Sequence, residues 1–151
     1  MALPPRRNVH VSRFAGRLAS RIEDHVRPYL LPGERIRALA LATQDKPQKF
    51  LAGLISLPAQ AFVGWPFYIV VTDQRFLAFK PTLTGEVMEV TISQPLSNVV
   101  VERFGRRLLR TLLVVRPGPT SQPVRFTFGP AWRSRAQAVH EALQGSLGAG
   151  P

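Results

Sequence analysis

Apolar residues recur at helical spacing near the start of the chain, over about residues 12–27. Residues three or four positions apart share one face of a helix, so the pattern predicts an amphipathic helix. The apolar stripe consists of Val11, Phe14, Leu18, Ile22 and Val26. Ser12 is the expected N-cap and Pro28 the expected stop. Either the stripe packs on the rest of the protein, or this basic helix lies on a membrane surface.

From residue 35 onward the pattern changes to short segments of alternating apolar and polar residues, separated by Pro, Gly, Asp and Ser. Such alternation is typical of β-strands. The predicted strands are 35–43, 67–72, 75–80, 86–92, 98–104, 107–116 and 123–128. Most connections, including a turn at Gly105-Arg106, have hairpin length and are too short for crossover helices, which predicts antiparallel pairing. Core-facing positions on two of the strands are Met88, Val90 and Ile92, and Val124, Phe126 and Phe128.

A second helical stripe begins near Trp132, with polar residues such as His140 pointing away from it. Gly145 and Gly148 are expected to stop this helix. Its apolar positions are Ala136, Val139 and Leu143, with Leu147 as a further candidate. An amphipathic helix with a large aromatic residue at its start would cover the open end of a curled sheet.

The predicted elements give a mostly β fold, a seven-stranded antiparallel barrel capped by a C-terminal α-helix, with an additional N-terminal amphipathic helix. We expect an N-terminal extension over 1–30, the barrel with its C-terminal helix over 31–147, and a disordered tail over 148–151.

Charge adds a preference for anionic partners. The chain has 20 Lys and Arg residues against 9 Asp and Glu, a formal net charge of +11. Nearly all the basic residues are arginine, which codon usage in a GC-rich genome would also produce. The chain has no cysteine, which excludes disulfides, thiolate metal sites and a cysteine nucleophile.

Two motifs carry a family resemblance. Leu-Pro-Gly-Glu at 31–34 precedes the first predicted strand, and Tyr-Ile-Val-Val-Thr-Asp-Gln-Arg-Phe-Leu-Ala-Phe at 68–79 spans the second and third. With the terminal helix, this arrangement resembles the bacterial pleckstrin-homology-like domains related to the GRAM group. The resemblance implies a side-chain-capped turn at Thr72-Asp73, with Arg75 fixing it by pairing with a carboxylate. The basic first hairpin of phosphoinositide-binding relatives is missing, which argues against specific phosphoinositide recognition.

Two segments are candidate binding surfaces. The first is the arginine-rich hairpin between the fifth and sixth strands, where guanidinium groups would bind phosphate bidentately or simply face water. Its anion- or lipid-binding candidates are Arg103, Arg106, Arg107 and Arg110, with Arg116 on the same strand face as Arg110. The second is the apolar connection that ends before residue 66, which would contact a membrane or a partner, or pack on the barrel. Its candidates are Lys46 and Lys49 for anions, and Phe50, Leu51, Leu54, Ile55, Phe62 and Trp65 for apolar contact.

The uncharged stretch 50–71 has the length of a membrane span. Two prolines and two glycines interrupt it, and its last residues are aromatic and β-branched, as in a buried strand. We therefore expect a strand there and not a transmembrane helix.

No catalytic constellation stands out. The three histidines are scattered, the carboxylates form no acid/base pair, and no strand leads into a glycine-rich phosphate loop. We expect a non-catalytic binding or scaffolding module without metal or cofactor, which engages a protein partner or an anionic phospholipid surface and has the option of self-association. It would be cytoplasmic, either free or peripheral at the inner face of the membrane. The alternative is a basic nucleic-acid-binding barrel, for which Phe104 is the one aromatic residue in the arginine hairpin.

Overall fold

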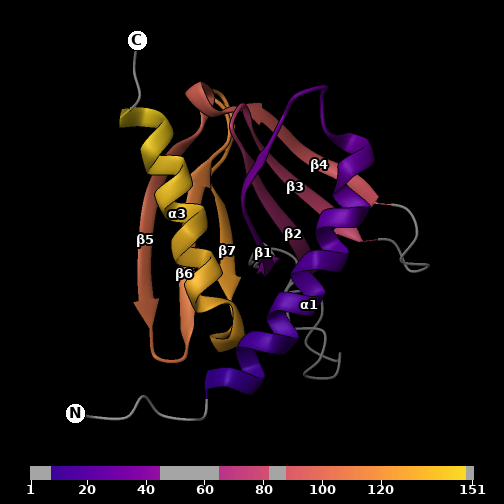
Figure 1. The fold of residues 1–151 in the computed structure, drawn as a ribbon. Helices are drawn as coiled ribbons and strands as arrows, with labels where there is room; N and C mark the ends of the chain where they lie inside the picture. Colours follow the sequence, from indigo (N-terminus) through magenta and orange to yellow (C-terminus); the bar gives the residue numbers. More distant parts are fainter. Residues whose placement is uncertain (1–7, 45–64, 82–87, 149–151) are drawn as a thin grey trace, which may run out of the picture.

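The computed structural model describes residues 8–44, 65–81 and 88–148 (Figure 1). The helical elements are α1 (Asn8–Val26), η1 (Arg27–Tyr29), η3 (Leu96–Asn98), η4 (Pro130–Trp132) and α3 (Arg133–Gly148). The strands are β1 (Ile36–Gln44), β2 (Trp65–Thr72), β3 (Arg75–Pro81), β4 (Met88–Pro95), β5 (Val100–Arg107), β6 (Arg110–Arg116) and β7 (Val124–Phe128). The predicted class is confirmed: the described residues form one seven-stranded sheet with a helix before it and another after it.

The strands follow the order β4-β3-β2-β1-β7-β6-β5, with every neighbouring pair antiparallel. β1 and β7 pair only at Thr43 with Thr127 and at Gln44 with Phe126, so two groups of strands diverge from this junction (Figure 1). Within the described residues β4 and β5 do not pair, so the sheet is open and the word barrel applies only loosely.

The core lies between the two groups of strands and the helices. Four of its phenylalanines are fully buried: Phe76, Phe79, Phe126 and Phe128. α3 packs three side chains onto the sheet as predicted, because Ala136, Val139 and Leu143 are at most 2% exposed. α1 contributes Ile22 and Val26 from its predicted stripe.

The start of α1 differs from the predicted one, and of the two glycines expected to stop α3 only Gly148 lies at its end. α1 begins at Asn8, so Ser12 lies inside the helix and its assignment as N-cap was wrong. No Pro or Gly separates the two residues, and Asn is itself favourable at a helix start. α3 runs to Gly148, so Gly145 does not stop it. A single exposed glycine costs a helix only about 1 kcal/mol, which the buried face of α3 offsets.

The inward face predicted for β4 is only partly correct. Ile92 is half-buried and packs against the core, but Val90 is 40% exposed. β4 is an edge strand, and a register irregularity occurs opposite Ala78 and Phe79, so alternation there does not lead to burial.

The described part of the uncharged stretch 50–71 is a strand and not a helix. Residues 65–72 form β2, which pairs with β1 and β3. No helix in the described part of the chain is long and apolar enough to cross a bilayer.

Candidate functional site

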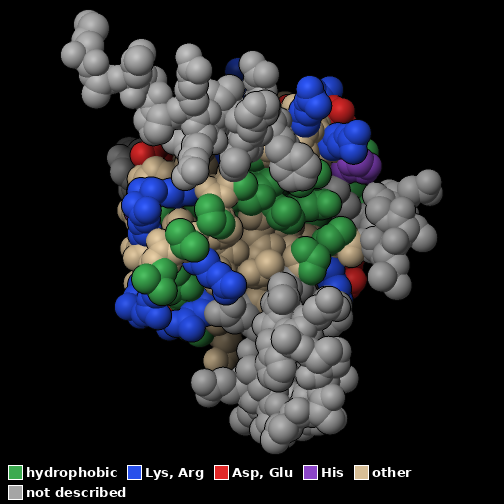
Figure 2. Space-filling model, turned by 90° about the horizontal axis from the view of Figure 1, so that it is seen from below, with side chains coloured by type: hydrophobic (Ala, Val, Ile, Leu, Met, Phe, Trp, Pro, Cys, Tyr) green, Lys and Arg blue, Asp and Glu red, His purple; other side chains and the backbone are tan. Residues whose placement is uncertain are grey.

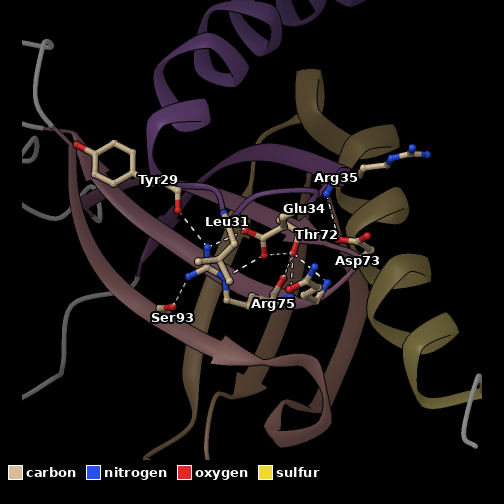
Figure 3. Close-up of polar contacts among 9 residues, drawn as sticks. Tyr29, Leu31, Glu34, Arg35, Thr72, Asp73, Arg75 and Ser93 are labelled. Carbon is tan, nitrogen blue, oxygen red and sulfur yellow. Dashed lines mark hydrogen bonds and ion pairs between the residues drawn. The ribbon is translucent and has the colours of Figure 1, made fainter.

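A buried ion pair between Glu34 and Arg75 joins the motif at 31–34 to the motif at 68–79 (Figure 3). The Glu34 side chain is fully buried, and both of its oxygens accept from Arg75: Nη2 lies 2.7 Å from Oε1, and Nε lies 2.9 Å from Oε2. The same carboxylate accepts from the Thr72 hydroxyl at 2.8 Å and from the Leu31 amide at 2.9 Å. This bidentate pairing with additional donors is the geometry in which a buried charge is well compensated.

The turn between β2 and β3 is capped by side chains, as the resemblance implied. Thr72 Oγ1 accepts from the amides of Gln74 at 3.1 Å and Arg75 at 2.8 Å. Asp73 Oδ1 accepts from the Arg35 amide at 3.0 Å, which ties the turn to the start of β1. The expected carboxylate partner of Arg75 is Glu34.

Arg75 also connects elements that are distant in sequence. Its guanidinium donates to the Tyr29 carbonyl oxygen and to Ser93 Oγ, each at 3.1 Å, which links η1 and β4 to the turn. The hydrogen bonds from Arg75, aided by those from Leu31 and Thr72, lower the pKa of Glu34 from 4.5 to about 2, against the opposing effect of burial. Because the carboxylate is fully engaged, the Glu34–Arg75 network is structural and is not a ligand site.

The arginine hairpin has its turn at an unexpected place. Arg107 pairs with Arg110, so the turn residues are Leu108 and Leu109 and not Gly105-Arg106. The observed register pairs Phe104 with Leu113 on the core side of the sheet, and this apolar contact outweighs the usual turn preference of glycine.

Two leucines in such a turn are unfavourable for folding. Leu108 has a φ of 48°, a backbone region that costs a non-glycine residue about 1–2 kcal/mol. Leu108 and Leu109 are also 94% and 76% exposed, more than any other large hydrophobic residue whose side chain the structure describes. Strain combined with exposure of apolar side chains is a reason to look for function.

The register distributes the hairpin arginines over both faces of the sheet. Arg103 and Arg107 lie on the outer face, whereas Arg106 pairs with Thr111 and lies on the face that α3 covers. Arg110 directly follows the turn and lines the groove between the hairpin and α3. All four are exposed. Arg116 does not join them, because it lies at the other end of β6 and forms an ion pair with Glu102.

A groove of about 980 Å³ separates this hairpin from the start of α3. Four arginines line it, two from the hairpin and two from α3: Arg106, Arg110, Arg133 and Arg135. The two turn leucines and Ala15 of α1 lie along it as well. Figure 2 looks onto this end of the molecule and shows Lys and Arg side chains gathered along one side, next to hydrophobic ones.

One aromatic stack connects the hairpin to α3. The rings of Phe104 and His140 lie parallel within 8°, with centroids 4.1 Å apart. His140 was predicted to point away from the protein; it is half-buried instead, and burial lowers its pKa below the usual 6.5. Phe104 packs partly against the core.

The second candidate surface lies mostly outside the described residues. Lys46, Lys49, Phe50, Leu51, Leu54, Ile55 and Phe62 all fall there. Trp65 is the first residue of β2 and pairs with Gln44, but its side chain is not described. The role of this second surface in membrane or partner contact stays a prediction.

The sequence analysis missed the two turn leucines and the two α3 arginines. The signal for the leucines was the run Arg-Arg-Leu-Leu-Arg at 106–110, which we placed partly in a strand. Comparison with known proteins adds no assignment, since no family model matches the chain and no curated protein matches it significantly.

Proposed function

We propose that this protein is a non-catalytic module of pleckstrin-homology-like type that docks on an anionic membrane surface through the β5–β6 hairpin. One observation carries the proposal: the strained turn presents Leu108 and Leu109 to solvent, between Arg107 and Arg110. The site of action would be the inner face of the cytoplasmic membrane, where anionic lipids give a negative surface potential.

The physical basis has two parts. Burial of a leucine side chain contributes about 1.5–3 kcal/mol, and the turn holds two leucines in an exposed conformation. Arginines near an anionic surface contribute about 1 kcal/mol each, and their guanidiniums remain at headgroup level while an apolar tip enters the lipid. Because the turn is held by the strand pairing of Arg107 with Arg110, little conformational entropy is lost on insertion.

The hairpin fits lipid better than it fits nucleic acid. Base stacking on single strands needs exposed aromatic rings among the arginines. Phe104 stacks on His140 and packs partly against the core, and the tip residues are aliphatic. A protein partner is the other occupant to be tested.

We expect wild-type protein to sediment with vesicles that contain anionic lipid and to stay in solution with neutral vesicles. The double variant Leu108→Asn/Leu109→Asn should bind anionic vesicles more than about tenfold more weakly, because the apolar contribution is lost. Asn tolerates a positive φ, so the turn and the fold should be retained, which circular dichroism and thermal unfolding will check.

The matched control is Val100→Thr, which replaces a residue 52% exposed at the other end of the same hairpin. Its binding should equal that of the wild type. Equal binding by the Asn double variant would contradict docking through the tip. Absence of wild-type binding to anionic vesicles would overturn the membrane proposal in favour of a protein partner.

A further inference from the structure

The groove beside the hairpin has an unusual charge balance. Its four arginines come from two separate elements, and none of the described residues that line it is acidic. Among the described residues, the ion pairs involve Arg27, Arg75 and Arg116 and none of these four. Like charges held close together repel one another unless an anion binds between them.

The groove and the hairpin tip are parts of one surface. Leu108 and Leu109 border the groove; Arg110 directly follows the turn, and Arg106 lies two residues before it. A lipid whose acyl chains contact the tip leucines would therefore hold its headgroup at the arginines. Thr111, Ser134 and Gln137 also line the groove and provide uncharged hydrogen-bonding groups.

We propose that this groove binds the headgroup of a membrane lipid that carries a phosphate monoester, an inference that rests on the proposed membrane docking. A phosphate monoester bears about −1.5 to −2 charge near neutral pH and has three terminal oxygens, whereas a diester has one charge and two such oxygens. Guanidinium groups favour the more highly charged form and bind its oxygens bidentately. Four arginines that have no carboxylate partner among the described residues match the monoester better.

The two groove arginines on α3 allow the inference to be tested without altering the hairpin. Arg133 is exposed and Arg135 half-buried, and both lie in the first turn of α3. The variant Arg133→Gln/Arg135→Gln removes two charges from the groove. The matched control Arg35→Gln/Arg37→Gln removes two charges where β1 begins, at the end of the strand away from its junction with β7. The backbone amide and carbonyl of Arg35 form hydrogen bonds with Asp73 in the β2–β3 turn. These contacts do not involve the Arg35 side chain, so it can be changed.

The measurement is binding to vesicles of phosphatidylcholine with either phosphatidic acid, a phosphomonoester lipid, or phosphatidylserine, adjusted to equal zeta potential. Wild type should bind the phosphatidic acid vesicles about five- to tenfold more tightly. The α3 variant should lose this preference, and the β1 control should keep it. In Arg133→Lys/Arg135→Lys the charge is kept but the bidentate geometry is lost, so the preference should also fall.

The possible failures are separable. Equal binding of wild type to both anionic vesicles, or an unchanged preference in the α3 variant, would overturn the headgroup site while membrane docking stands. No binding to either vesicle would overturn the docking proposal and the inference with it. Titration with glycerol 3-phosphate, followed by chemical shifts of groove amides, tests the source of the phosphate. Binding of that compound without binding to phosphatidic acid vesicles would contradict a lipid ligand.

Discussion

Replacing Glu34 with alanine is expected to lower the free energy of unfolding by about 3–5 kcal/mol, because it leaves Arg75 without its buried partner. The carboxylate is fully buried and accepts from Arg75, Thr72 and the Leu31 amide. Each of these donors would lose an acceptor, and a buried donor without a partner costs about 1–3 kcal/mol. Urea unfolding at neutral pH, monitored by tryptophan fluorescence, measures the loss.

The chain offers a matched control for this experiment. Glu23 and Arg27 also form an ion pair, at 3.8 Å, but their side chains are 49% and 68% exposed. Glu23→Ala should therefore change the free energy of unfolding by less than about 0.5 kcal/mol. The combination Glu34→Ala/Arg75→Met, which removes both charges, should be less destabilised than the sum of the single variants. A loss below about 1 kcal/mol for Glu34→Ala would refute the structural role of the Glu34–Arg75 network.

Stability should also fall steeply in acid, through the same carboxylate. Folding lowers the pKa of Glu34 from 4.5 to about 2, mainly through its hydrogen bonds from Arg75. The folded state therefore binds this proton more weakly than the unfolded state does. The stabilisation is fully present above pH 4.5 and is lost as the pH falls toward 2. At about 1.36 kcal/mol per pH unit, the difference amounts to about 3 kcal/mol.

The pH effect can be isolated from that of the other carboxylates. Wild type and Glu34→Gln are unfolded in urea at a series of pH values, and their free energies of unfolding are subtracted. The difference should be constant between pH 7 and about pH 5, and should shrink by about 3 kcal/mol toward pH 2. A difference that does not depend on pH would mean that Glu34 titrates normally in the folded protein.

Much of the fold is predictable because its determinants are local in sequence. Apolar residues at helical spacing predicted the buried face of α3 and the burial of Ile22 and Val26 on α1, although the buried Ala15 and Ala19 were not part of the predicted stripe. Phe126 and Phe128 are buried as their alternation indicated. The Thr72 side chain accepts from the amides of Gln74 and Arg75, so this cap, like the two features above, depends on neighbours along the chain. Asp73 instead accepts from the Arg35 amide, 38 residues away, a contact that local pattern does not predict.

The candidate site was harder to predict because it depends on contacts between distant segments. The turn moved from Gly105-Arg106 to the two leucines because the pairing of Phe104 with Leu113 fixes the register, and local turn preference favours glycine. Arg133 and Arg135 join the hairpin arginines only because α3 packs against the sheet. The position of His140 likewise follows from its ring contact with Phe104.

The Glu34–Arg75 network and the β5–β6 hairpin are separated in space. The Glu34–Arg75 network lies where β1 begins, and the β5–β6 turn lies toward the other end of the sheet, where β1 reaches β7 (Figure 1). The network therefore stabilises the frame that holds the hairpin without contacting the proposed membrane surface. Variants in the two regions should have separable effects, on stability in one case and on binding in the other.

The most direct test of membrane docking is the environment of residue 109 when vesicles are added. Because the chain has no cysteine, Leu109→Cys can be labelled uniquely with an environment-sensitive nitrobenzoxadiazole dye, with Arg37→Cys labelled as the control. Anionic vesicles should shift the emission of the dye at 109 to the blue and allow quenching by spin-labelled acyl chains, while the dye at 37 is unchanged. Vesicle-bound protein with unchanged emission at 109 would show that the hairpin tip does not enter the membrane.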